Sequence, residues 1–151
     1  MTPVVHAVLT LGLVLACGGR GREVDGWVEI RGQRVAVELA DTVPKQSLGL
    51  GGRDALEWDR GMLFPYPQAG FYGFWMKDMR FDLDIVWILR DRIVDLHHRV
   101  PHAPEREAGR ELPVYRPRRA ADTVLEVPAG YAQAHGWRDG DRVIRGGGAP
   151  R

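Results

Sequence analysis

FWMKDMRFDLDIVWI, the stretch from Phe74 to Ile88, decides the fold of this chain. It is strongly apolar, yet charged residues stand in its middle. From Met79 onward the two kinds alternate, with an apolar set of Met79, Phe81, Leu83, Ile85 and Trp87 and a charged set of Arg80, Asp82 and Asp84. Alternation with a period of two predicts a half-buried strand whose apolar side chains face the core. The charged row, which Asp78 extends, is then either the solvated face of the strand or part of a site.

Strands are also predicted on both sides of this stretch. Residues 27–40, WVEIRGQRVAVELA, contain two alternating runs separated by Gly32-Gln33, which predicts a hairpin. Arg90-Asp91 is a plausible tight turn into a partner strand, RIVDL. The segments DTVLEV at 122–127 and RVIR at 142–145 predict two further strands.

Two short helices complete the expected elements. Thr42 predicts a helix N-cap with Pro44 in the first turn, and the glycines from Gly49 end this helix. PAGYAQAHG, residues 128–136, fits one or two helical turns. In residues 60–70, RGMLFPYPQAG, the two prolines are expected to end regular structure. The predicted fold class is therefore α+β and mostly β: a compact, twisted antiparallel sheet or a partly closed barrel with one or two short helices.

Length and composition fit one globular domain. The chain has 151 residues, of which 44% are hydrophobic and 27% charged, and this balance is typical of a soluble globular protein. The formal net charge of +1 indicates no general affinity for polyanions, and no motif for nucleic-acid binding is present, so we expect no nucleic-acid partner. With one cysteine, an internal disulfide is impossible.

The N-terminus predicts export. An apolar run from Ala7 to Ala16 is shorter than the ~20 residues of a spanning helix and has the length of a signal-peptide core. VLAC, ending at Cys17, resembles the bacterial lipobox, in which the cysteine is lipidated. An ordinary cleaved signal or a membrane-associated helix is the alternative. We therefore expect a bacterial cell-envelope protein held at the membrane by a lipid on Cys17.

The expected organisation follows from these boundaries. Residues 1–16 form the signal peptide, residues 17–25 the lipidated cysteine and a flexible tether, residues 26–145 a single domain, and residues 146–151 a disordered tail.

Several motifs resemble one known family. TVPKQSLGLGGRDAL, GMLF, FWMKDMRFDLDIV, VLEVPAG and GDRV occur in this order, and together they resemble the domain of unknown function 192 family from about Val35 to Ile144. The resemblance implies a small protein, often exported or membrane-tethered, without an assigned activity. The chain departs from the family pattern at Gly51, where Met is common, at Asp78, where Asn is usual, and at Asp82, where Pro is usual.

Five residues that match the family pattern are candidates for a ligand site: Arg53, Trp75, Lys77, Asp84 and Glu126. A few converging charges beside apolar walls are what a small polar ligand requires. The alternative is a solvated strand face on which Arg80 relieves repulsion between the neighbouring carboxylates.

Three histidines in HHRVPH, His97, His98 and His102, could supply imidazoles to a metal, or could simply be solvated in a proline-rich connection. We predict no cofactor, since no phosphate-binding glycine loop is present. No nucleophile stands out either, because the single serine, Ser47, lacks a Gly-x-Ser-x-Gly turn.

These observations favour a non-enzymatic function. The leading hypothesis is an envelope-tethered accessory or binding domain whose partner is a small polar ligand or an envelope protein. One alternative is a metal-assisted envelope hydrolase that uses Asp84 and Glu126. Another is a purely structural or interaction lipoprotein that uses the arginine-rich connection around Arg116–Arg119.

Overall fold

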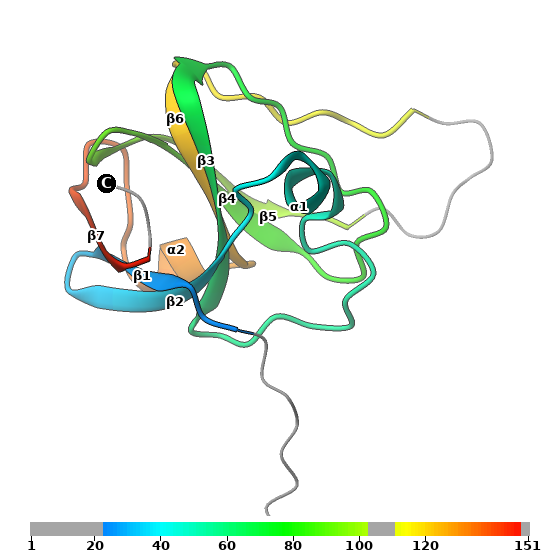
Figure 1. The fold of residues 1–151 in the computed structure, drawn as a ribbon, viewed down its shortest axis with the longest axis horizontal. Coiled ribbons are helices and arrows are strands. Elements are labelled where there is room, and N and C mark those ends of the chain that lie inside the picture. The colour runs from blue at the N-terminus through cyan, green and yellow to red at the C-terminus, as the bar shows by residue number, and fades with distance from the viewer. Residues whose placement is uncertain (1–22, 103–110, 149–151) are drawn as a thin grey trace, which may run out of the picture.

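The structure, a computed structural model, describes residues 23–102 and 111–148 (Figure 1). The predicted signal peptide, Cys17 and the last three residues of the predicted tail lie outside these ranges. The elements in chain order are β1 (Gly26–Ile30), β2 (Gln33–Leu39), α1 (Val43–Leu48), β3 (Arg60–Gly70), β4 (Leu83–Leu89), β5 (Arg92–Val100), β6 (Ala121–Pro128), α2 (Tyr131–Ala134) and β7 (Val143–Gly147).

All seven strands belong to one sheet, in the order β5-β4-β6-β3-β2-β1-β7. The sheet is mixed rather than purely antiparallel, because β2 and β3 pair in parallel. It curls until the two outermost strands meet at one end: the amide of Ile93 donates to the Asp141 carbonyl at 3.0 Å, and that of Val143 to the Asp91 carbonyl at 2.8 Å. The result is a half-barrel, which confirms the predicted fold class.

Two apolar clusters fill the two sides of the sheet. The barrel core lies inside the curl, where Val86 and Ile88 of β4 pack with Tyr131 of α2. The outer cluster lies on the side of α1, where Ile85 and Trp87 pack with Phe64, Met76 and Met79. The two helices accordingly lie on opposite sides of the sheet (Figure 1).

The prediction of a half-buried strand with a wet face is therefore wrong for β4. This strand lies between β5 and β6, and Leu83 to Ile88 are all buried. It begins only at Leu83, so Arg80 and Asp82 belong to the preceding loop rather than to a charged strand row. Burial of both faces suits a strand inside a sheet that is covered on each side.

The prolines of RGMLFPYPQAG do not end regular structure, contrary to the prediction. β3 continues through Pro65 and Pro67 to Gly70, and its register with β6 shifts between Pro65 and Gly70. A proline lacks the N–H that a ladder needs, but an irregular position in a strand tolerates it. The last strand likewise extends further than expected, because Gly146 and Gly147 belong to β7 and not to a tail.

The predicted hairpin and helix cap both form, but the turn lies one residue earlier than the predicted Gly32-Gln33. It is made by Arg31 and Gly32, whose φ angles are 53° and 78°, as a tight primed turn requires. Thr42 caps α1, where its Oγ1 accepts from the Lys45 amide at 3.5 Å. Within the described residues, neither helix has the length and apolar character that crossing a bilayer demands.

Candidate functional site

Three of the predicted site residues, Trp75, Lys77 and Glu126, line one pocket with a volume of about 90 Å³. The pocket lies where the end of α1 meets the outer side of β3 and the segment 73–79. Its apolar walls come from distant parts of the chain, namely Leu48, Phe64, Tyr66, Phe74 and Met79. Sequence reasoning missed these wall residues, because only the tertiary structure brings their segments together.

Glu126 is the buried acid of this pocket. It stands on β6, with Met62 of β3 and Ile85 of β4 as its cross-strand neighbours, and it is 5% exposed. No hydrogen bond from another described residue reaches its carboxyl, and its oxygens are not among the fully buried unpartnered atoms of the described chain. Burial raises the pKa of Glu126 from 4.5 to about 8, although the positive charge of Arg53 lowers it in part. At neutral pH this carboxyl is therefore mostly protonated and uncharged.

The exposed residues that line the pocket include two large apolar side chains, one cation and Ser47. Leu48, at the end of α1, is 69% exposed, and Trp75 is 53% exposed. The Lys77 ammonium lies over the Trp75 ring, 5.7 Å from its centroid, within the range of a cation–π contact. Two large apolar side chains held in water beside a pocket are more typical of a binding surface than of a solvated loop.

Asp78 fastens the segment that carries Trp75 and Lys77. Its φ is 56°, in the left-handed region, and its carbonyl accepts from the Gly52 amide at 2.8 Å. Asn and Asp adopt this conformation more readily than other side chains. The left-handed φ therefore favours Asn or Asp, which explains how Asp78 can stand where the family usually has Asn.

Arg53 lies in a neighbouring pocket of about 290 Å³ and not in that of Glu126. Its guanidinium makes a bidentate pair with Glu38, with N–O distances of 2.7 and 2.8 Å. The two pockets share Leu48 and Gly49, so they flank the end of α1. Arg53 thus acts on Glu126 through its charge and not through a hydrogen bond.

Asp84 is separate from the pocket and holds the fold. It is fully buried; its Oδ1 accepts from the amides of Arg99 at 2.7 Å and Gly130 at 2.9 Å, and its Oδ2 from that of Ala132 at 2.8 Å. It thereby caps the start of α2 and ties it to the irregular end of β5. All three bonds go to backbone groups, so the predicted role of Asp84 in ligand binding gives way to a structural one.

The register also separates the two carboxylates of the predicted hydrolase. Asp84 pairs with Val127, and Ile85 pairs with Glu126. Successive strand residues point to opposite faces, so Asp84 faces α2 while Glu126 faces α1. The two carboxylates of the alternative metal-assisted hydrolase, Asp84 and Glu126, therefore lie on opposite faces of the sheet and do not share one site.

The histidines do not converge either. His102 Nδ1 lies 2.6 Å from Asp82, His98 Nδ1 lies 3.8 Å from Asp84, and His97 Nε2 lies 3.9 Å from Asp95. No group of three potential metal ligands forms within residues 23–102 and 111–148. Each of the three histidines lies nearest a different carboxylate, so the described structure does not bring His97, His98 and His102 together around one metal.

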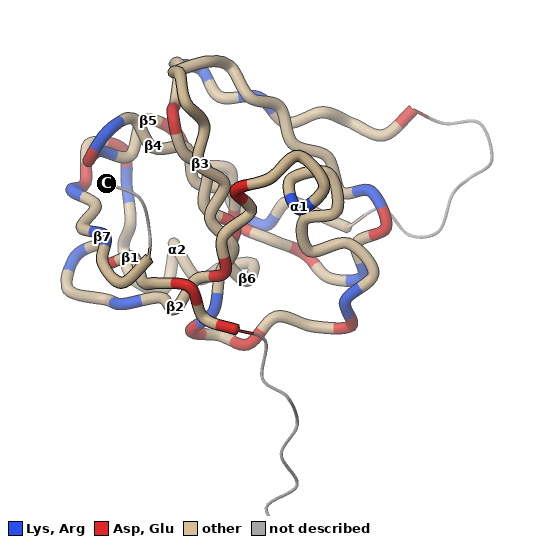
Figure 2. Tube along the Cα trace, in the orientation of Figure 1, with Lys and Arg blue, Asp and Glu red and all other residues tan. Residues whose placement is uncertain are grey.

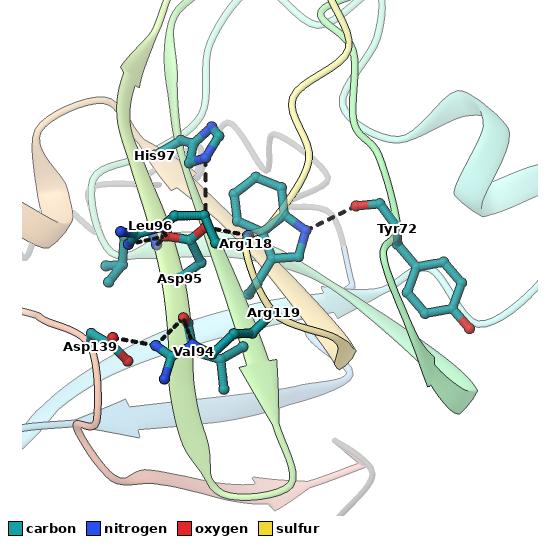
Figure 3. Close-up of polar contacts among 9 residues, drawn as sticks. Tyr72, Val94, Asp95, Leu96, His97, Arg118, Arg119 and Asp139 are labelled. Carbon is teal, nitrogen blue, oxygen red and sulfur yellow. Dashed lines mark hydrogen bonds and ion pairs between the residues drawn. The ribbon is translucent and has the colours of Figure 1, made fainter.

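Asp95 organises a polar cluster that sequence reasoning missed (Figure 3). Its buried carboxylate accepts from the amide of Arg118 at 2.8 Å, from the Arg118 guanidinium at 2.7 and 3.1 Å, and from the amide of Leu96 at 3.0 Å. Burial alone would raise the pKa of Asp95, but the hydrogen bonds and charge of Arg118 outweigh it and lower the pKa. A lone Asp inside the apolar run RIVDL was the available signal.

The same cluster engages the arginine-rich connection. Arg119 donates to the Val94 carbonyl through its Nε at 3.0 Å and pairs with Asp139 (Figure 3). Arg118 and Arg119 therefore fasten the connection to β5.

The architecture and the pocket together define a class of protein: a small half-barrel domain with a buried acid under an aromatic-lined opening. The chain belongs to the domain of unknown function 192 family, described as an uncharacterized ACR, whose model matches residues 26–144. The motifs had predicted this membership.

Two solved structures share the fold. A Sinorhizobium meliloti 1021 protein, proposed to be a transcription regulator, is 28% identical, with a TM-score of 0.69, and the match covers 81% of this chain and 94% of that one. A protein of unknown function from Novosphingobium aromaticivorans is 26% identical, with a TM-score of 0.69 and coverage of 78% and 83%. A search of curated proteins found no match.

Proposed function

We propose that this chain is an envelope-tethered binding domain that takes a small polar ligand into the pocket of Glu126. One observation carries the proposal: a carboxyl that is 5% exposed lines an open pocket and has no hydrogen-bonding partner among the described residues. Because the carboxyl lines an open pocket, a ligand can reach it and hydrogen-bond to a group that no other described residue engages, which supports a site kept for binding.

The envelope location rests on the sequence. The apolar run from Ala7 to Ala16 and the lipobox-like Cys17 support export and a lipid anchor, with residues 17–25 as the tether. Replacing Cys17 with serine tests this part: the variant should lose lipid labelling and leave the membrane fraction. A variant that stays membrane-bound with its labelling intact would refute the anchor.

A protein partner is the second candidate, and the exposed pair Leu48 and Trp75 favours it. Regulation of transcription, which is proposed for the Sinorhizobium protein, is not part of the proposal. The net charge is +1, and acidic and basic residues are interspersed along the described chain (Figure 2). Such a distribution gives little general attraction to a nucleic-acid backbone.

Catalysis is not part of the proposal either. The charged side chains lining the pocket in the described structure are Lys77 and Glu126, and no second carboxylate or histidine lines it beside them. General acid–base chemistry on one substrate usually needs such a second group.

The experiment is native mass spectrometry of the full chain, purified from the envelope of its own host in an uncharged detergent. The wild-type chain should retain a small bound mass, and Trp75→Ala should lose it. Phe71→Ala is the matched control, because Phe71 is 59% exposed, as large as a pocket-wall side chain, and does not line the pocket. A bound mass that survives Trp75→Ala, or a wild-type chain without one, counts against this pocket as the ligand site.

A further inference from the structure

Aromatic rings make up much of the pocket wall. Phe64 and Tyr66 come from β3, and Phe74 and Trp75 from the segment that closes the pocket. Phe74 meets Phe64 edge to face, with ring centroids 5.0 Å apart. The face of an aromatic ring carries negative electrostatic potential and attracts cations, above all organic ammonium groups. A pocket of such rings around a carboxyl is chemically suited to a cation.

The chain already places an ammonium at the mouth. Lys77 Nζ lies 5.7 Å from the centroid of the Trp75 ring. This charge makes Lys77 a competitor for any cation that enters the pocket.

The second basic group near Glu126 is already engaged. Arg53 is 12% exposed and is held by both oxygens of Glu38 at 2.7 and 2.8 Å, outside the pocket. Its charge is therefore largely balanced by Glu38, and the Glu126 carboxyl remains free to pair with a ligand.

We propose that the ligand of this pocket presents an alkylammonium group, which inserts between the aromatic walls and pairs with the Glu126 carboxylate. The inference rests on the proposed function and adds the chemical class of the ligand. The pocket volume of about 90 Å³ limits the size of the group that can enter. Since one water needs roughly 10–15 Å³, the pocket takes a head group of a few non-hydrogen atoms and not a whole metabolite.

Binding of this kind is coupled to a proton. Burial raises the pKa of Glu126 to about 8, so the free protein holds the proton at neutral pH. The ammonium pairs with the ionised form, and the proton leaves to solvent. The ionised fraction rises from about 1% at pH 6 to about one half at pH 8, so the affinity should rise about fifty-fold over this interval.

The groups near Glu126 on the neighbouring strands are Tyr66 of β3, whose pKa burial raises to about 12, and the apolar Ile85 of β4. The remaining charged groups are Lys77, which lines the pocket, and Arg53, which lines the neighbouring pocket. The expected pH dependence therefore belongs to Glu126.

The test uses the ¹⁵N-labelled full chain in an uncharged detergent, followed by amide NMR. Three probes of one shape are titrated at matched ionic strength: n-butylammonium chloride, 1-butanol and sodium butyrate. The amides of Gly49, Gly51 and Gly73, which line the pocket, report binding. We expect saturable shifts with n-butylammonium, about fifty-fold tighter at pH 8 than at pH 6, and at least tenfold weaker binding of the other two probes.

Two variants sharpen the result. Glu126→Gln should abolish both the preference for the ammonium probe and its pH dependence. Lys77→Met should bind n-butylammonium about two- to fivefold more tightly, because a competing like charge is removed. A pocket built for anions would show the opposite, since Lys77 would then be its main attraction.

The outcomes distinguish failure of the ligand class from failure of the proposed function. Butyrate or butanol binding at the pocket glycines as tightly as n-butylammonium would overturn the ligand class and leave the proposed function standing. Pocket amides that respond to none of the probes, in a chain whose other amide signals stay dispersed, would overturn both. If the Glu126→Gln variant still prefers n-butylammonium, Glu126 is not the partner of the ammonium group, and the inference is refuted.

Discussion

The buried acid should make the stability of this protein fall as the pH rises. The pKa of Glu126 is raised by burial from 4.5 to about 8, so between these values the folded chain holds a proton that the unfolded chain has lost. When a group has a higher pKa in the folded chain than in the unfolded chain, the free energy of unfolding decreases as the pH rises above the pKa of the unfolded chain. Each pKa unit corresponds to about 1.36 kcal/mol, so the loss is about 3 kcal/mol at pH 7 and levels off near 5 kcal/mol above pH 8.

Glu126→Gln isolates this effect, because glutamine has nearly the same shape and does not titrate. The variant and the wild type should unfold with similar free energies at pH 4, where Glu126 is protonated in both states. The variant should then become more stable than the wild type, by about 3 kcal/mol at pH 7 and about 5 kcal/mol at pH 9. Urea unfolding of the full chain at a series of pH values, followed by tryptophan fluorescence, measures the difference.

Glu57→Gln is the matched control, since the Glu57 side chain is 76% exposed and makes an ion pair with Arg60, three residues along the chain. Its stability difference from the wild type should stay within about 0.5 kcal/mol at every pH. If the stability difference between Glu126→Gln and the wild type is equally flat from pH 4 to pH 9, the reasoning is refuted. That result would mean that folding does not raise the pKa of Glu126.

Two further substitutions test the described contacts. Asp84→Asn should lower the unfolding free energy by about 2–4 kcal/mol, because one amide oxygen cannot replace the carboxylate that accepts from Arg99, Gly130 and Ala132. Urea unfolding measures this loss, and a loss below about 0.5 kcal/mol would contradict the capping role. Trp87→Phe should cost about 1–3 kcal/mol, since it deletes the indole bond to the Tyr72 carbonyl at 3.0 Å and leaves a gap in the outer cluster. Thermal unfolding measures this second effect, and an unchanged midpoint would argue that the indole is not held there.

Local patterns in the sequence predicted the local structure well. The β1–β2 hairpin and the N-cap at Thr42 follow from turn chemistry and capping, which act over a few residues, although the turn lies at Arg31-Gly32 and not at the predicted Gly32-Gln33. Motif resemblance predicted the family. The prolines of β3 show the limit of such rules, because a shift in sheet register absorbed what local chemistry predicted to be a stop.

Which of the candidate residues share a site depended on the strand order and register of the sheet. Trp75, Lys77 and Glu126 were predicted together and do share a pocket, whereas Arg53 and Asp84, chosen by the same pattern, do not. No local rule separates these five residues. Only the register of β4 against β6 sends Asp84 and Glu126 to opposite faces.

The sequence by itself therefore determined most of the strands, the cap of α1 and the family, and it predicted an export signal, because each depends on residues close together along the chain. Tertiary structure alone decided that β4 would be covered on both faces and that Glu126 would be buried under a wall of aromatic side chains. The physical reason is that β6 pairs between β3 and β4, and this long-range pairing sets both the dielectric environment of Glu126 and the neighbours that surround it.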